Sequence, residues 1–344
     1  MSADNNDSSR ATSKASPLTA TPMPLLPITS PRTVELCASL PLRPNDVFIC
    51  SYPKSGTTWT QHIVLSLLVK SASKSRCSGA AVSDLEYQHV SDYAPFYEVD
   101  AHWNPQTQNL NDTIQTNHNR LGRRVFNTHL RWNMLPSTME EGAQSGKNAK
   151  FIYLLRDPLD VCLSFYCHLS NQMEGGYDGT FQEFFDEWVN GDIAFGSYID
   201  HIVSFAPAFV DAGETREVLL ISYEEMLSDL PSVVQKIAKF IEADVTLEDI
   251  EELLPTFSFG HMKKDLDRFQ PRSVTWKNNF QFLRRGVSGD SLTVISDRER
   301  SILRDWFERE DVTSKLESTL LARNDDALEK FRNVCPGPSS YKYR

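Results

Sequence analysis

The sequence lacks an apolar run long enough to span a membrane, which takes about 20 predominantly apolar residues in a helix. Its first residues include Asp4 and Asp7 and contain no apolar segment of the kind that marks a secretory signal. We therefore expect a cytoplasmic protein with no membrane partner.

Positive charge is also scarce. The chain has 35 Lys and Arg against 46 Asp and Glu, and its formal net charge is -11. A surface of this sign does not attract nucleic acid or an anionic membrane. We expect neither as a partner, although a local group of basic residues can still bind a small anion.

Closely spaced cysteine pairs are absent. None of the cysteines forms a C-x-x-C pair, and several lie inside predicted apolar elements. This usage is typical of reduced packing residues in an intracellular protein. No cluster has the spacing of metal ligands, so we expect no metal. The six cysteines are Cys37, Cys50, Cys77, Cys162, Cys167 and Cys335.

The Walker A motif G-x-x-x-x-G-K-[ST] is absent as well, but residues 51–59, S-Y-P-K-S-G-T-T-W, have phosphate-binding character. A short apolar run at 47–50 predicts a buried strand before them, and apolar residues at helical spacing follow. Such a turn aims backbone N–H groups and a helix N-terminus at one point. Gly56 lets the backbone approach closely, and Lys54 adds a cation. The alternative is an ordinary strand-to-helix turn; the lysine and the hydroxyls of Ser55, Thr57 and Thr58 favour phosphate binding.

Strands and helices alternate along the rest of the chain. Apolar runs predict strands at 47–50, 124–129, 150–155 and 218–223, and helical periodicity covers 59–70, 159–171, 181–189, 197–210 and 224–240, with a loop at 71–86. This alternation predicts an α/β fold: a single domain with a central parallel sheet flanked by helices and a P-loop-like nucleotide-binding turn. The Ser-, Thr-, Pro- and Ala-rich residues 1–31 predict a disordered tail. The domain covers 32–335, and 336–344 form a C-terminal tail.

Polar residues follow the predicted strand ends. Lys54, His129, Arg156 and Tyr223 each lie just beyond one strand. In parallel sheets the ligand sits at the carboxyl ends of the strands, so we expect these side chains at one rim. The basic, glycine-containing loop at 282–290 would add a second phosphate clamp.

The order Y-P-K-S-G-T-T-W resembles the phosphate loop of the cytosolic sulfotransferases, which take a sulfuryl group from 3′-phosphoadenosine 5′-phosphosulfate (PAPS). Further segments resemble that family in family order, including Y-L-L-R-D-P-L-D-V-C-L-S-F-Y and F-L-R-R-G-V-S-G-D. The matching segments are 95–98, 127–130, 153–166, 221–226, 257–264 and 282–290.

The resemblance implies a role for each matched residue. His129 would be the general base, Lys54 would contact the oxygen between sulfur and phosphorus, and Ser164 would bind the 3′-phosphate and restrain Lys54. No metal is required. The implied cofactor-binding residues are Lys54, Ser55, Gly56, Thr57, Thr58, Trp59, Arg156, Ser164, Tyr223, Ser258, Phe259, Met262, Arg284, Arg285 and Gly286. The implied acceptor-binding residues are Phe96, Tyr97, His129 and Phe165.

The chain departs from the family pattern at several positions. Asn127 replaces a lysine two residues before the histidine, and Phe257 stands where a threonine helps hold the nucleotide. Arg131 replaces a proline and Ser291 a tryptophan. The lysine and glutamate of the family's dimer motif are not found around Thr293, so a homodimer is possible but its motif is incomplete.

We therefore predict a PAPS-dependent sulfotransferase that acts on a hydroxyl or amine of a small acceptor. Aromatic residues favour an apolar pocket for a phenol, a steroid-like alcohol or an amine; these residues are Phe96, Tyr97, Trp103, Trp132 and Phe165. One alternative is a P-loop kinase or NTPase, which would need Mg²⁺ and a Walker order. Another, motivated by Asn127 and Phe257, is a PAPS-binding protein with weak or lost catalysis.

Overall fold

A computed structural model describes residues 23–75, 87–143, 146–309 and 325–334. Its centre is a parallel sheet of strand order β2-β1-β3-β4. The strands are β1 (Val47–Ser51), β2 (Val125–Thr128), β3 (Ala149–Leu155) and β4 (Arg216–Ser222). β1, β2 and β3 are buried along their whole length, which explains the apolar runs in their sequences. The predicted fold class is confirmed.

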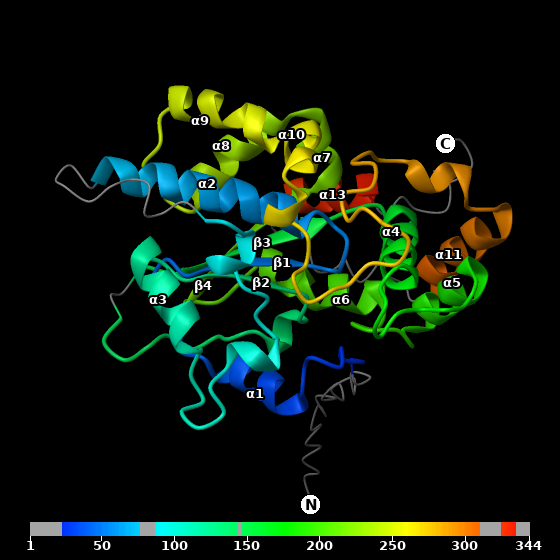
Figure 1. Cartoon of the computed structure of the whole chain (residues 1–344), viewed down its shortest axis with the longest axis horizontal. Helices are drawn as coiled ribbons and strands as arrows, with labels where there is room; N and C mark the ends of the chain where they lie inside the picture. The colour runs from blue at the N-terminus through cyan, green and yellow to red at the C-terminus, as the bar shows by residue number, and fades with distance from the viewer. Residues whose placement is uncertain (1–22, 76–86, 144–145, 310–324, 335–344) are drawn as a thin grey trace, which may run out of the picture.

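Helices cover both faces of this sheet (Figure 1). One face packs against α2 (Thr57–Ser75), α8 (Leu230–Phe240), α9 (Leu247–Leu253) and α10 (Phe259–Lys264). The other face packs against α1 (Pro31–Ser39), α4 (Pro158–Ser170), α5 (Phe181–Asn190), α6 (Tyr198–Phe205), α11 (Asp297–Arg309) and α13 (Asp325–Val334). The remaining α-helices described are α3 (Asp112–Leu121) and α7 (Tyr223–Ser228). None of the helices in the described ranges has the length and hydrophobicity of a membrane span.

Some predicted boundaries were wrong. α2 continues to Ser75, so the first part of the predicted loop at 71–86 is helical, and residues 76–86 lie outside the described chain. The single helix predicted from 224 to 240 is two helices, α7 and α8, that meet at Asp229. Asp229 has non-helical backbone angles, φ -146° and ψ 66°, and its carboxylate caps α8 by accepting from Ser232 N–H. Pro231 suits the first turn of the new helix.

Part of the predicted N-terminal tail has defined structure. Ser30 caps α1 by accepting a hydrogen bond from the Thr33 N–H, and Thr29 is buried. Ser30 also donates to Asp100, which ties this segment to a distant loop. Only residues 1–22 of the predicted tail, and residues 335–344 at the other end, lie outside the description.

The core on the α4 side of the sheet contains a stack of aromatic rings. Phe48 in β1 is fully buried, with ring centroids 5.0 Å from Phe126 in β2 and 4.7 Å from Phe151 in β3. This stack joins the three strands whose ends carry Lys54, His129 and Arg156, so the site rests on it.

Phe48→Ala should lower the free energy of unfolding by about 3–5 kcal/mol, because it leaves a cavity between the rings of Phe126 and Phe151. Denaturant unfolding measures the loss. Leu247→Ala is the control: Leu247 is 62% exposed and its truncation should change stability by no more than about 0.5 kcal/mol. Equal effects of the two substitutions would contradict this assignment of the core.

Candidate active site at the carboxyl edge of the sheet

The phosphate-binding turn predicted from the sequence connects β1 to α2. Lys54 and Gly56 both have positive φ, 71° and 105°, so the turn is tightly bent at these two residues. A Cβ on Gly56 would lie 2.9 Å from Cδ2 of Tyr223, the first residue of α7. Glycine is therefore required there both for its φ and because the Tyr223 ring is packed against the turn.

Several hydrogen-bond donors around this turn have no partner. The Ser55 hydroxyl, the Trp59 indole Nε1 and the Arg156 Nε are buried and make no hydrogen bond within the described chain. An unpaired buried polar group costs about 1–3 kcal/mol. The Trp59 ring lies edge-on to Tyr223, at 5.8 Å between centroids. Unused donors beside two aromatic rings fit an anionic ligand that carries a ring system.

Arg156 links three segments at this edge. Its guanidinium donates to the Lys54 carbonyl at 2.8 Å and to the Val287 carbonyl at 3.3 Å, and it stacks over the Tyr223 ring at 4.2 Å. The end of β3 is thus joined to the phosphate turn, to the start of α7 and to the basic loop predicted as a second clamp.

That basic loop is held against α4. Arg284 and Arg285 both pair with Asp290, and the Asp160 carboxylate accepts from Gly289 N–H at 2.7 Å and from Ser291 N–H at 2.9 Å. Arg284 lies close enough to the turn to lower the pKa of Lys54, but a bound phosphate would have to compete with Asp290 for either arginine.

The same loop meets α10 at a second glycine. Gly286 has φ 64°, and a Cβ there would lie 2.2 Å from the Phe259 ring. Two predicted cofactor-binding residues are therefore in contact. Their neighbours have structural roles: Ser258 caps α10 by accepting from His261 N–H, and Met262 is buried in the core.

The side chain of Lys54 lies against α4, but its partner is not the one predicted. Lys54 Nζ is 3.2 Å from Nδ1 of His168 and 4.3 Å from the centre of the Phe282 ring. The Ser164 hydroxyl makes no hydrogen bond to the described residues, so the expected contact between Ser164 and Lys54 is absent from them. Burial, and then the charge of Arg156, lower the pKa of Lys54 to about 7.

His129 lies beyond β2 with its ring fixed in one orientation. Its Nδ1 is 2.7 Å from the Ser51 carbonyl, which can only accept, so Nδ1 carries the proton and Nε2 is left as the basic nitrogen. Burial, with a contribution from the charge of Lys54, lowers the pKa of His129 to about 4, so the imidazole is neutral at pH 7.

Two buried groups hold the backbone of His129. Glu98 accepts its N–H at 2.7 Å, and His201 Nε2 donates to its carbonyl at 3.1 Å. Burial raises the pKa of Glu98 to about 8, so this carboxyl is largely protonated at neutral pH and adds little negative charge beside the imidazole.

Aromatic rings surround the imidazole. Phe96 is 5.3 Å and Phe195 is 5.2 Å from the His129 ring, and Phe165 is 6.5 Å from Phe195. Phe96 and Phe165 were predicted to contact the acceptor; Phe195 was missed, because it lies in a turn after α5 at φ 70° without a motif around it.

The other aromatic residues predicted for the acceptor pocket pack in the core around the sheet. Tyr97 is buried between Phe48 and Phe126, and its hydroxyl donates to the Cys37 carbonyl, so its side chain belongs to the core. Trp103 and Trp132 are also core residues.

Two of the departures from the family pattern have clear structural positions. Asn127 is buried, and its amide donates to the Ala94 carbonyl at 2.8 Å. Phe257 is fully buried, with its ring 5.2 Å from that of His62. Phe257 offers no polar group to a nucleotide, and Asn127 uses one of its two amide N–H groups on Ala94.

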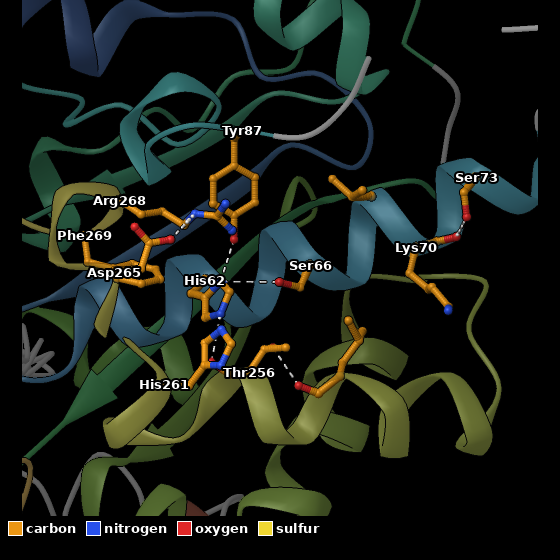
Figure 2. A pocket seen from close by; sticks show the side chains of 12 residues that line it. His62, Ser66, Lys70, Ser73, Tyr87, Thr256, His261, Asp265, Arg268 and Phe269 are labelled. Atoms are coloured by element: carbon orange, nitrogen blue, oxygen red, sulfur yellow. Dashed lines mark hydrogen bonds and ion pairs between the residues drawn. The ribbon is translucent and has the colours of Figure 1, made fainter. Parts of the chain in front are cut away.

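A separate pocket of about 240 Å³ lies on α2 beside α9 and α10 (Figure 2). His62 and Tyr87 point toward one another in it, with 2.5 Å between Nδ1 and the hydroxyl. Burial lowers the pKa of His62 to about 4, so the pair is neutral. The pocket contains none of the predicted site residues; it is lined by His62, Ser66, Val69, Lys70, Ser73, Tyr87, Leu253, Thr256, His261, Asp265, Arg268 and Phe269.

The family model of the sulfotransferase domain matches residues 44–319, and the chain therefore belongs to the sulfotransferase family. Luciferin sulfotransferase of Photinus pyralis is 32% identical over 238 residues, which span 65% of this chain and 58% of that relative, less than two thirds of its length. Sulfotransferase 1 family member D1 of Rattus norvegicus is 28% identical, over 83% of this chain and 89% of the relative.

Solved structures share the fold. Mouse sulfotransferase SULT7A1, complexed with PAP, superposes with a TM-score of 0.60 at 22% identity, over 90% of this chain and 95% of that one. Retinol dehydratase, in complex with androsterone and the inactive cofactor PAP, has a TM-score of 0.60 at 20% identity, over 81% and 84% of the two chains.

Gly56→Ala should weaken nucleotide binding at least about tenfold, because it strains the backbone at φ 105° and pushes the Tyr223 ring away from the turn. Titration calorimetry with PAP measures the loss. Gly213→Ala is the matched control: Gly213 has φ 85°, but a Cβ there meets no atom within 4 Å. It should lose stability and keep its affinity. Unchanged affinity in Gly56→Ala would show that the turn does not hold the nucleotide.

Proposed function

We propose that the protein transfers the sulfuryl group of PAPS to a hydroxyl or amine of a small, apolar or aromatic acceptor. The observation that carries this proposal is the meeting of Lys54, Arg156 and the basic Nε2 of His129 at the ends of adjacent parallel strands. Family membership supports the reaction class, and the unpaired donors of Ser55, Trp59 and Arg156 support the nucleotide.

PAPS supplies an activated sulfuryl group whose leaving group is a phosphate. The turn around Gly56 and the hydroxyls of Ser55, Thr57 and Thr58 hold the 5′-phosphate, with Trp59 and Tyr223 beside the adenine. Arg156, Ser164 and the loop at Arg284–Gly286 bind the 3′-phosphate, and Arg284 and Arg285 exchange Asp290 for it.

On the acceptor side, His129 Nε2 takes the proton of the attacking hydroxyl. Its fixed tautomer presents the lone pair without rearrangement, because Nδ1 already donates to Ser51. Lys54 places its charge where negative charge develops on the leaving oxygen. The mechanism uses no metal, since a sulfuryl group carries less charge than a phosphoryl group.

The acceptor class follows from the rings beside the base. Phe96, Phe165 and Phe195 supply apolar surface and no charge, which suits a phenol or a sterol-like alcohol. One structural neighbour, retinol dehydratase, was solved both with androsterone and with retinol. Radiolabelled PAPS assayed with a panel of phenols, sterols and amines in the presence of a chelator tests the reaction. Turnover that needs ATP and Mg²⁺ would favour the kinase alternative instead.

A weak or inactive PAPS-binding protein is the second candidate. The observation that favours it is the position of Asn127. Its amide donates to the Ala94 carbonyl, and it provides no positive charge near the acceptor. PAPS binding without turnover across the panel would support it. We further propose a cytoplasmic location, in keeping with relatives such as cytosolic sulfotransferase 17 of Arabidopsis thaliana, and homodimer formation stays a prediction.

His129→Ala should reduce kcat by about 10²–10⁴-fold while leaving PAP affinity within about twofold, because the imidazole faces the acceptor. Steady-state rates and calorimetry measure the two quantities. His261→Ala, an exposed histidine at the separate pocket, should leave both unchanged. Wild-type turnover in His129→Ala would rule out His129 as the base.

The 3′-phosphate should dominate nucleotide affinity. A charge-assisted hydrogen bond contributes about 1.5–3 kcal/mol, so two arginine contacts predict that PAP binds at least about a hundredfold more tightly than AMP. Arg156→Ala should shrink this ratio sharply. Arg298→Ala, which removes an exposed partner of Asp186, should not change it. Equal wild-type affinities for PAP and AMP would contradict the assignment of PAPS as donor.

A further inference from the structure

His168 occupies a position that neither the motifs nor the proposed mechanism uses. It lies in the last turn of α4, four residues after Ser164, and its Nδ1 is 3.2 Å from Lys54 Nζ. Its ring packs against Trp276 at 5.0 Å and Phe282 at 6.0 Å, and Lys54 lies over the same Phe282 ring. The amine is thus held between an imidazole and an aromatic face.

The charges around the contact between Lys54 and His168 decide which group donates the hydrogen bond. The groups that face Lys54 are Arg156 at the end of β3, Arg284 in the basic loop, Cys167 on α4 and His129 beyond β2. Two of these are cations, so a charged imidazole would add a further like charge. Burial, and then the charge of Lys54, lower the pKa of His168 well below its usual value. His168 is therefore neutral, and its Nδ1 accepts a hydrogen bond from the Lys54 amine.

We propose that His168 is a positioning residue for Lys54. The His168 imidazole accepts a hydrogen bond from the Lys54 ε-amino group and holds this group in its charged form at the transfer site. When PAPS binds, the bridging oxygen of the donor replaces the imidazole as the hydrogen-bond acceptor. This rests on the proposed function, in which Lys54 meets the leaving group. It also assigns to His168 the restraint that the family resemblance gave to Ser164.

A neutral acceptor beside a buried ammonium favours the charged form of that amine. A hydrogen bond to a charged group contributes about 1.5–3 kcal/mol, so its loss should lower the pKa of Lys54 by about one to two units. Since that pKa is about 7 with His168 in place, the variant amine would be mostly uncharged at neutral pH. The alkaline limb of the kcat profile should then move to lower pH by the same amount.

Two variants separate this role from packing. His168→Phe keeps a ring against Trp276 and Phe282 but removes the acceptor, whereas His168→Gln keeps an acceptor that does not titrate. The pKa of Lys54 is read from the ¹³Cε shift in ¹³C-lysine-labelled full-length protein, with the signal assigned by its loss in Lys54→Arg. This measurement needs neither PAPS nor turnover.

We expect the pKa of Lys54 to fall in His168→Phe and to stay near the wild-type value in His168→Gln, with kcat falling about tenfold or more only in the Phe variant. An unchanged pKa in His168→Phe, or equal shifts in both variants, would overturn the proposal. Should the Phe variant not fold, Lys54→Met gives the reciprocal test: the imidazole ¹⁵N signals of His168 must show its pKa rising, and no change overturns the contact. If the pKa values follow the expected pattern but the wild-type protein transfers no sulfuryl group, the role of His168 stands and the proposed function is contradicted.

Discussion

The site is built around positive charge and hydrogen-bond donors that the described chain leaves unsatisfied. Burial lowers the pKa of the Lys54 amine, and the nearby Arg156 guanidinium lowers it further. The Ser55 hydroxyl, the Trp59 indole and one nitrogen of Arg156 have no partner in the described residues. A fold tolerates such a concentration of unpaired donors where a ligand supplies the missing acceptors. The packing of the turn against the end of β3 and the start of α7 therefore creates a site that suits a ligand with several negative charges.

The part of the site around His129 follows the opposite principle, since its ionisable groups are largely neutral at pH 7. Ser51 orients the ring of His129, and Glu98 and His201 hold its backbone. Burial keeps both the imidazole and the Glu98 carboxyl largely uncharged at neutral pH. In the proposed reaction, His129 would act as the base without a counter-ion that raises the pKa of its imidazole. Lys54 links the two parts, because its carbonyl accepts from Arg156 and its charge lowers the pKa of His129.

The sequence predicts the phosphate turn, the strands and the rim residues because each is encoded locally. A buried parallel strand reads as an apolar run, and the polar residue after it must lie at the edge of the sheet. Tyr97 could not be placed this way, because it lies in an irregular stretch where no periodicity says which way a side chain points. The break at Asp229 left a signal, Pro231, that the continuous apolar face obscured. Phe195 acquires its neighbours only through the tertiary fold.

His168 lies between these cases. Its spacing of four residues from Ser164 places both on one face of α4, so helix geometry alone predicts that either can reach the same neighbour. The contact with Lys54 depends also on Trp276 and Phe282, which lie more than a hundred residues away in sequence. Both rings pack against the His168 imidazole. The Asn127 amide donates to the Ala94 carbonyl and brings no second cation, so in the proposed reaction stabilisation of the leaving group would rest more heavily on the charge of Lys54. A pKa near neutrality makes that charge conditional, so whatever fixes the protonation of Lys54 also sets the pH range in which the transfer site works.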